Sequence, residues 1–151
     1  ALGGGCELAL ACDLRIAAEE AGIGLTESRI GVFPAAGGTQ RLPRLVGNAR
    51  AMELMFTAEP VSGRRAAEIG LVNEAVPGGR LDERVRELAT LIASRSPNSL
   101  RTIKRLVTAG TALPLADGLA LERAALPEVF ASADYAEGLA AFAEKRPPRF
   151  G

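Results

Sequence analysis

The sequence contains no histidine. A Ser-His-Asp or Cys-His nucleophilic site and a His-ligated metal are therefore excluded within these 151 residues. Acid–base chemistry would have to use Asp, Glu, Lys, Tyr or Cys. Cysteine is also scarce, because Cys6 and Cys12 are too few for a disulfide framework and lack the spacing of a metal site. We expect both thiols to be packing residues in a protein of a reducing compartment.

Net charge and long apolar runs are absent as well. Eighteen basic and eighteen acidic residues cancel, and no basic stripe favours nucleic-acid binding. No apolar run approaches the ~20 residues that a membrane-spanning helix needs. With 48% apolar and 24% charged residues, the composition is that of a globular domain with a hydrophobic core.

The first half of the chain mixes short helical and extended patterns. An apolar run predicts a helix over residues 6–12, and alternation predicts a strand over 13–17. Further extended pieces are expected near 23–25 and over 72–76, with helices from about Thr39, over 48–57 and over 63–69. Three glycines precede the first of these helices. Because a native domain seldom opens in this way, we expect further residues upstream of Ala1, and the lack of a visible secretory signal carries no information.

The second half follows a helical period. A long amphipathic helix is expected after Gly78-Gly79 and ends before Pro97. Another helix is expected after Pro97, and two more over about 115–131 and 134–145. The sequence thus predicts an α/β part over residues 1–78 and a helical part over 79–151.

The glycine run at Gly3–Gly5 is the first feature that can carry chemistry. Glycines ahead of a helix leave backbone N–H groups free to bind a phosphate, a carboxylate or a developing enolate oxygen. A tight turn explains the same glycines. Glu7 in the first helical turn is either a surface residue that complements the helix dipole or a buried carboxylate with a functional role.

Glu27 is a second candidate, because it precedes a loop rich in Gly and Pro. Alone it reads as a glutamate at a helix start, but together with Glu7 it suggests acid–base work by two carboxylates. The spacing of the two residues does not establish that they meet.

Four stretches resemble the enoyl-CoA hydratase/isomerase (crotonase) family. They are ALGGGCELALACD, TESRIGVFPAAGGTQRLPRLVG, AAEIGLV and EGLAAFAEKRPP, which occur in the family's order and cover nearly the whole chain. The resemblance implies a spiral of ββα turns over residues 1–78, followed by a helical trimerisation region. It also implies trimers or paired trimers, and a location in the bacterial cytoplasm or the mitochondrial matrix.

The resemblance also implies roles for individual residues. Gly4 would supply one N–H of an oxyanion hole for the thioester carbonyl, with the second N–H coming from upstream of Ala1. Glu7 and Glu27 would hold the catalytic water, Glu27 as the main proton donor to Cα and Glu7 as the group that orients and deprotonates the water. No metal or redox cofactor would be needed.

Three further positions match the family. Ala35 stands where the family often has glycine, and its backbone N–H would help to position the water. Phe142 and Lys145 match residues that contact coenzyme A, commonly across a subunit interface. From the sequence alone, a core aromatic and a solvated lysine are the favoured interpretations.

The resemblance favours a hydratase, because relatives that isomerise, cleave or hydrolyse usually alter one of the two glutamates. The sequence of the motifs also resembles the branch that contains methylglutaconyl-CoA hydratase. Some members of that branch bind AU-rich RNA, but the neutral net charge gives RNA binding no support here. Other possibilities are an enoyl-CoA isomerase, a catalytically silent acyl-CoA-binding scaffold and a helical interaction module. Acyl-chain preference cannot be read from these residues.

Overall fold

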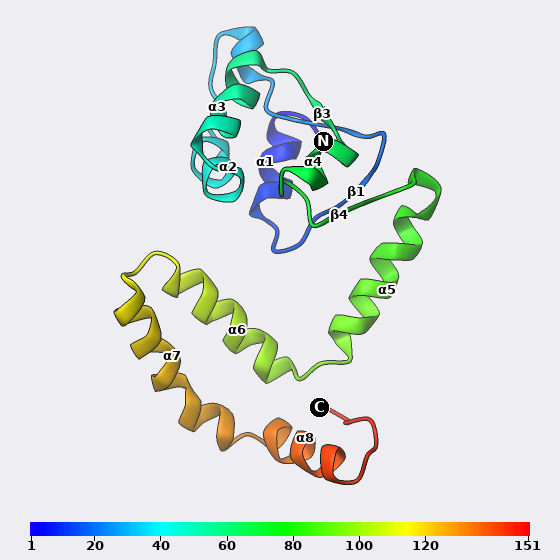
Figure 1. The fold of residues 1–151 in the computed structure, drawn as a ribbon, viewed down its shortest axis with the longest axis vertical. Coiled ribbons are helices and arrows are strands. Elements are labelled where there is room, and N and C mark those ends of the chain that lie inside the picture. The colour runs from blue at the N-terminus through cyan, green and yellow to red at the C-terminus, as the bar shows by residue number, and fades with distance from the viewer. The chain divides into compact units, whose positions relative to one another are not determined.

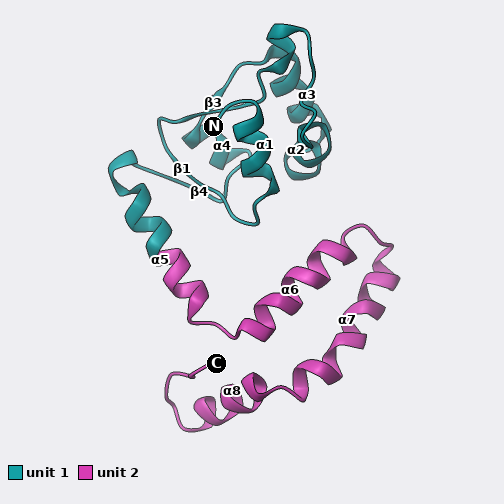
Figure 2. Ribbon diagram, turned by 180° about the vertical axis from the view of Figure 1, so that it is seen from behind, with its two compact units in different colours: residues 1–86 teal, residues 87–151 magenta.

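The computed structural model describes residues 1–151 as two compact units, residues 1–86 and residues 87–151 (Figure 2). The first unit contains α1 (Gly4–Ala11), β1 (Ile16–Ala18), β2 (Gly22–Ile23), the 3₁₀ helix η1 (Glu27–Ile30), α2 (Gly38–Val46), α3 (Asn48–Thr57), β3 (Val61–Ser62), α4 (Gly63–Glu68), β4 (Glu74–Val76), the 3₁₀ helix η2 (Gly78–Arg80) and the start of α5 (Leu81–Ala93). The second unit continues α5 and adds α6 (Pro97–Gly110), α7 (Leu115–Phe130) and α8 (Ala133–Ala143).

Two small sheets frame the first unit. β1 pairs in parallel with β4, with Ile16 opposite Glu74, and β2 pairs antiparallel with β3. A parallel bridge between Leu2 and Gly24 ties the chain ahead of α1 to the end of β2. These pairings hold the start of α1 beside the segment that precedes η1.

The core of the first unit lies where α1, α2, α3 and α4 meet the strands (Figure 1). Its largest fully buried side chains are Leu25, Leu42, Leu71 and Cys6. Burial of one such leucine stabilises the fold by about 1.5–3 kcal/mol. α1 and α2 therefore pack as parts of one core, although 26 residues separate the end of the first from the start of the second.

The second unit is a helical array in which α6 packs along α7 and α7 contacts α8 (Figure 1). Ser96 caps α6 by accepting the Ser99 N–H at 3.0 Å, and its hydroxyl donates to Asp134 Oδ2 at 2.6 Å. The carboxyl-terminal tail is held by Glu137, which binds the Arg146 guanidinium through both oxygens at 2.6 and 3.0 Å. Few apolar side chains are buried in this unit, chiefly Ala125 and Ala141.

The predicted helices are all present, with ends that differ by a few residues from those expected. The strand expected over 13–17 is shifted and shortened to Ile16–Ala18. Cys12, expected to be a packing residue, is exposed, whereas Cys6 is buried as expected. The two units divide after Arg86, within α5, whereas the sequence suggested a boundary after residue 78. None of the helices is both long enough and apolar enough to cross a bilayer.

Candidate active site

The N-terminal turn of α1 is shaped by glycine. Gly3 caps the helix with φ of 53° and ψ of −127°, a conformation that residues with a Cβ rarely adopt. Its N–H donates to the Gly24 carbonyl at 2.9 Å, and its own carbonyl accepts the Glu7 N–H at 3.0 Å. The turn is therefore fixed to the end of β2 on one side and to the helix on the other.

Gly4 is the first residue of α1, so its N–H has no acceptor within the helix. The neighbouring Gly5 N–H donates to the Leu2 carbonyl at 3.0 Å, whereas the Gly4 N–H finds no acceptor elsewhere in the chain. A Cβ added at Gly4 would have no atom within 4 Å. Gly4 thus presents a free donor to open space at the positive end of a helix dipole.

Glu7 is 4% exposed and is held from one side. Its Oε1 accepts the Ala36 N–H at 2.7 Å and the Gly38 N–H at 2.8 Å. Its Oε2 accepts no hydrogen bond from the chain. The carboxylate is therefore oriented by backbone donors of the loop before α2, and its second oxygen keeps its capacity to bind a ligand or water.

The loop that supplies these donors depends on two glycines. Gly37 caps α2 with φ of 106°, which suits glycine. At Gly38 an added Cβ would lie 2.6 Å from Pro34 Cβ, 2.9 Å from Leu25 Cδ1 and 3.0 Å from Glu7 Oε1. Only glycine therefore lets the start of α2 approach Glu7 this closely.

Glu27, the first residue of η1, reaches the same turn of α1. Its Oε1 would lie 3.4 Å from a Cβ built on Gly3. Its Oε2 is buried and has no hydrogen-bond partner. A buried carboxylate oxygen without a partner is costly, so such groups are concentrated where a ligand or a reaction uses them.

Cys6 lies close to both carboxylates. Burial, together with the charges of Glu27 and Glu7, raises the pKa of its thiol to about 11. The thiol therefore stays protonated at neutral pH, which makes it a packing group and not a nucleophile. The structure thus brings Gly4, Glu7 and Glu27 together around one helical turn, which the spacing alone did not establish.

The other predicted site residues belong to other segments of the chain. Ala35 is exposed in the loop next to the two donors, and its N–H makes no hydrogen bond within the chain. Phe142 is 85% exposed, and Lys145 is exposed with φ of 55°; both belong to the second unit. The expectation of a core aromatic at position 142 is therefore wrong for this chain.

Sequence reasoning missed Ala36 and Gly38 as the groups that orient Glu7. The signal available was the Gly37-Gly38 pair after Pro34, which indicated a special backbone but not its target. The packing of this loop against α1 makes Glu7 the acceptor of both N–H groups.

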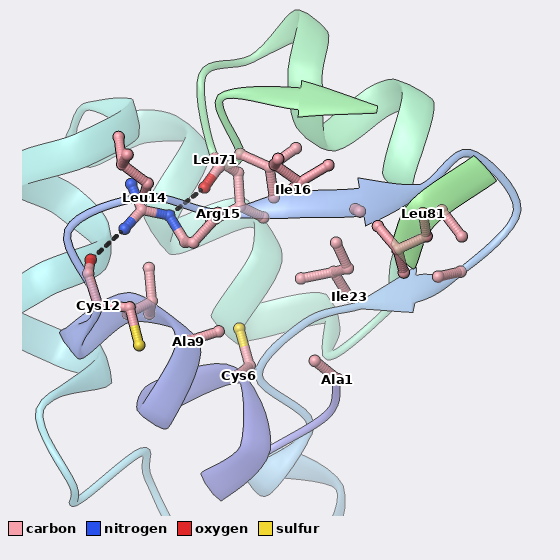
Figure 3. Close-up of a pocket in the computed structure, with 15 residues that line it drawn as sticks. Ala1, Cys6, Ala9, Cys12, Leu14, Arg15, Ile16, Ile23, Leu71 and Leu81 are labelled. Atoms are coloured by element: carbon pink, nitrogen blue, oxygen red, sulfur yellow. Dashed lines mark hydrogen bonds between the residues drawn. The ribbon is translucent and has the colours of Figure 1, made fainter. Parts of the chain in front are cut away.

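An apolar cavity of about 350 Å³ lies beside α1, β1 and β2 (Figure 3). Its wall includes Cys6, Leu14, Ile23 and Leu71, and Arg15 spans its rim through bonds to the Leu71 and Cys12 carbonyls at 2.9 and 2.7 Å. Neither glutamate lines it. The candidate active site is therefore the first turn of α1 and not this cavity.

Comparison with known proteins identifies the family of the chain. A family model described as enoyl-CoA hydratase/isomerase matches residues 1–151. The human enoyl-CoA hydratase domain-containing protein 2, mitochondrial, is 47% identical over 99% of the chain, and rat methylglutaconyl-CoA hydratase, mitochondrial, is 42% identical over 99%. The match covers 53% and 49% of these two relatives, so the chain spans about half the length of the curated relatives it matches.

A solved structure agrees with this placement. The enoyl-CoA hydratase from Bacillus anthracis superposes with a TM-score of 0.97 and 49% identity, covering 99% of this chain and 58% of that one. The fold is thus that of the crotonases, seen here as a helix-dominated α/β arrangement with two small sheets. The chain belongs to the enoyl-CoA hydratase/isomerase family.

Proposed function

We propose that this chain is part of an enoyl-CoA hydratase, which adds water across the double bond of a trans-2-enoyl-CoA thioester to give a 3-hydroxyacyl-CoA. The observation that carries the proposal is the placement of Glu7 and Glu27 beside the same glycine-opened turn of α1. Hydration of a conjugated thioester needs donors for the charge that develops on the carbonyl oxygen, and groups that move protons to and from water.

Gly4 meets the first need. Its free N–H points out of the helix start, so a thioester carbonyl can approach without meeting a side chain. A preorganised donor of this kind stabilises a developing oxyanion by about 3 kcal/mol. Because the charge is taken by N–H donors, the reaction as proposed requires no metal or redox cofactor. A complete oxyanion hole takes a second donor, which we expect from a part of the protein outside these residues.

The two carboxylates meet the second need. Glu7 is held through Oε1, so its Oε2 accepts an O–H of the water and draws off its proton as the oxygen attacks Cβ. Glu27, with its buried unpartnered Oε2, delivers a proton to Cα on the same face. Glu27 starts protonated and Glu7 ionised, and water is consumed as OH at Cβ and H at Cα. The step leaves Glu7 protonated and Glu27 ionised, so one proton passes from Glu7 to Glu27 before the next turnover. The two carboxylates act as a coupled unit, in which Glu27 is the main proton donor to Cα and Glu7 the main acceptor of the proton from water.

Three further expectations belong to the same proposal. The exposed Ala35 N–H helps to position the water. Phe142 and Lys145, both exposed in the second unit, contact coenzyme A in an assembly of trimers or paired trimers. The location is the bacterial cytoplasm or the mitochondrial matrix, in line with the bacterial and mitochondrial relatives.

The test is hydration by the full-length enzyme of a panel of short, long and branched enoyl-CoA thioesters, followed at the conjugated thioester absorbance. The panel includes 3-methylglutaconyl-CoA, because a hydratase of that name is 42% identical to the chain. Glu27→Gln should lower kcat by about 100-fold or more, the scale of losing a general acid, without changing the oligomer.

Glu68→Gln is the matched control, because Glu68 is an exposed carboxylate paired with Arg65 on α4. Turnover of the Glu27→Gln variant at the wild-type rate would remove Glu27 from its role. Coenzyme A binding without turnover of any thioester would favour a silent scaffold, and isomerisation of 3-enoyl thioesters in place of hydration would favour an isomerase.

A further inference from the structure

The loop that orients Glu7 is itself held by a side chain that neither the motifs nor the proposed chemistry assigned. Arg41 lies on α2, four residues after the cap residue Gly37. Its Nη1 donates to the Ala36 carbonyl at 2.9 Å, and its backbone N–H donates to the Gly37 carbonyl at 2.8 Å. One residue thus binds the two successive carbonyls of the loop.

The carbonyl that the guanidinium binds lies between the two donors to Glu7. The Ala36 carbonyl belongs to the peptide that joins Ala36 to Gly37. The peptide before it supplies the Ala36 N–H and the peptide after it supplies the Gly38 N–H, at 2.7 and 2.8 Å from Glu7 Oε1. A displacement of the central peptide would move both donors, because adjacent peptides share their Cα atoms.

The fit of the guanidinium against Gly37 points to a specific contact. A Cβ built on Gly37 would overlap Arg41 Nη1 and lie 2.9 Å from Cζ. Glycine at this position therefore serves two ends, since it adopts φ of 106° and leaves room for the guanidinium.

Helix stability does not account for Arg41. It lies about one turn from the positive end of the α2 dipole, where a cation gains nothing from the dipole. Fixing a long side chain there also costs rotamer entropy. The hydrogen bond from Arg41 to the Ala36 carbonyl offsets this entropy cost and restrains the peptide between the two donors to Glu7.

We infer that Arg41 is a positioning residue for hydration, acting through the Ala36–Gly37 peptide to keep both N–H donors on Glu7. The inference rests on the proposed function for its kinetic consequence and on the observed hydrogen bonds for its geometry. Arg41 does not touch the reacting atoms, so its loss affects kcat through the orientation of Glu7 and leaves substrate binding largely intact.

The kinetic test compares Arg41→Gln with Arg44→Gln in the full-length enzyme. Arg44 is the matched control, because its Nη1 also donates to a backbone carbonyl of α2, that of Gln40, at 2.7 Å, away from Glu7. Arg41→Gln should lower kcat by about 10-fold with KM changed less than about twofold, the scale of a small misplacement of a catalytic group. Arg41→Lys should recover part of the loss, because its ammonium still donates but lacks the planar fork.

A double-mutant cycle separates positioning from general damage. In a Glu7→Gln background, Arg41→Gln should leave the residual kcat nearly unchanged, because no carboxylate remains to be oriented. A loss of about 10-fold in both backgrounds, or an equal loss from Arg41→Gln and Arg44→Gln, would overturn the inference.

A crystal structure of the Arg41→Gln variant tests the geometry without any turnover. Lengthening of the bonds from Ala36 N and Gly38 N to Glu7 supports the inference, and retention of both at their present lengths refutes it. If the wild-type enzyme hydrates no enoyl thioester, the proposed function fails, while this structural comparison still decides whether Arg41 positions Glu7.

Discussion

Replacement of Glu7 by leucine should destabilise the protein more than replacement by glutamine. Leucine leaves the N–H groups of Ala36 and Gly38 without an acceptor. The bond to Gly38 is buried, so its loss costs about 1–3 kcal/mol, and the bond to Ala36 is partly buried, so water recovers some of its cost. The two costs together come to about 3 kcal/mol, and the apolar area that leucine buries offsets part of them, so we expect a net loss of about 2 kcal/mol.

Glutamine keeps an oxygen in the place of Oε1, so both N–H groups remain bonded. What is lost is the strengthening that a charged acceptor gives, about 1 kcal/mol in all. Both variants should lose most of the hydration activity and keep only a residual rate, because neither side chain can take a proton from water. The two variants should therefore differ in the free energy of unfolding while sharing the loss of hydration activity.

The assay is urea denaturation followed by far-UV circular dichroism, with the midpoint and the m-value fitted separately for each variant. Glu68→Leu and Glu68→Gln provide the control pair, and they should differ by less than about 0.5 kcal/mol because Glu68 is exposed. If Glu7→Leu and Glu7→Gln also differ by less than that, the two N–H bonds do not contribute the stability assigned to them, and the reasoning fails.

Three further predictions concern other parts of the chain. Gly4→Ala should leave the free energy of unfolding unchanged or raise it by about 0.5–1 kcal/mol, because alanine favours helices, yet lower kcat more than Gly5→Ala does in the hydration assay. Cys6 should resist alkylation at pH 8 until the protein is unfolded, as mass spectrometry of the labelled peptide would show, because burial raises the pKa of its thiol to about 11; labelling in the folded state would contradict this. Hydrogen bonds from Arg146 and from the Arg149 N–H lower the pKa of Glu137 to about 2, below its usual 4.5. The contact between Glu137 and the tail should therefore be complete above pH 4.5 and lost as the pH falls through 2. An NMR titration of the Glu137 carboxyl and the Arg149 amide would check this, and a midpoint near pH 4.5 would refute it.

The existence of most helices was predictable, but the first strand was placed too early. Alternation marked residues 13–17 as extended. In the structure the Arg15 N–H donates to the side-chain oxygen of Asn73 at 2.8 Å and not to a backbone carbonyl, and the regular ladder begins at Ile16. Its partner strand is 58 residues away, and no local pattern reveals such a pairing.

The convergence of the two carboxylates was likewise beyond the reach of spacing. Glu7 and Glu27 meet because the Leu2–Gly24 bridge and the bond from Gly3 to Gly24 align the start of α1 with the segment that enters η1. These are backbone contacts with no side-chain signature. The amphipathic faces of the later helices were correctly recognised, but Ile103 and Val107 are more than half exposed, so their apolar faces find little cover within this chain.

Gly4 and Gly38 show two different reasons for glycine at one site. At Gly38 the fold itself demands it, because a Cβ would collide with Pro34, Leu25 and Glu7. At Gly4 nothing in the chain does, since φ is helical and the space is open, and glycine there costs about 0.5–1 kcal/mol relative to alanine. The space beside Gly5 is open as well, but its N–H already donates to Leu2. Of the two open positions only Gly4 offers a hydrogen bond to a group outside the chain, so a ligand carbonyl is expected at Gly4 and not at Gly5.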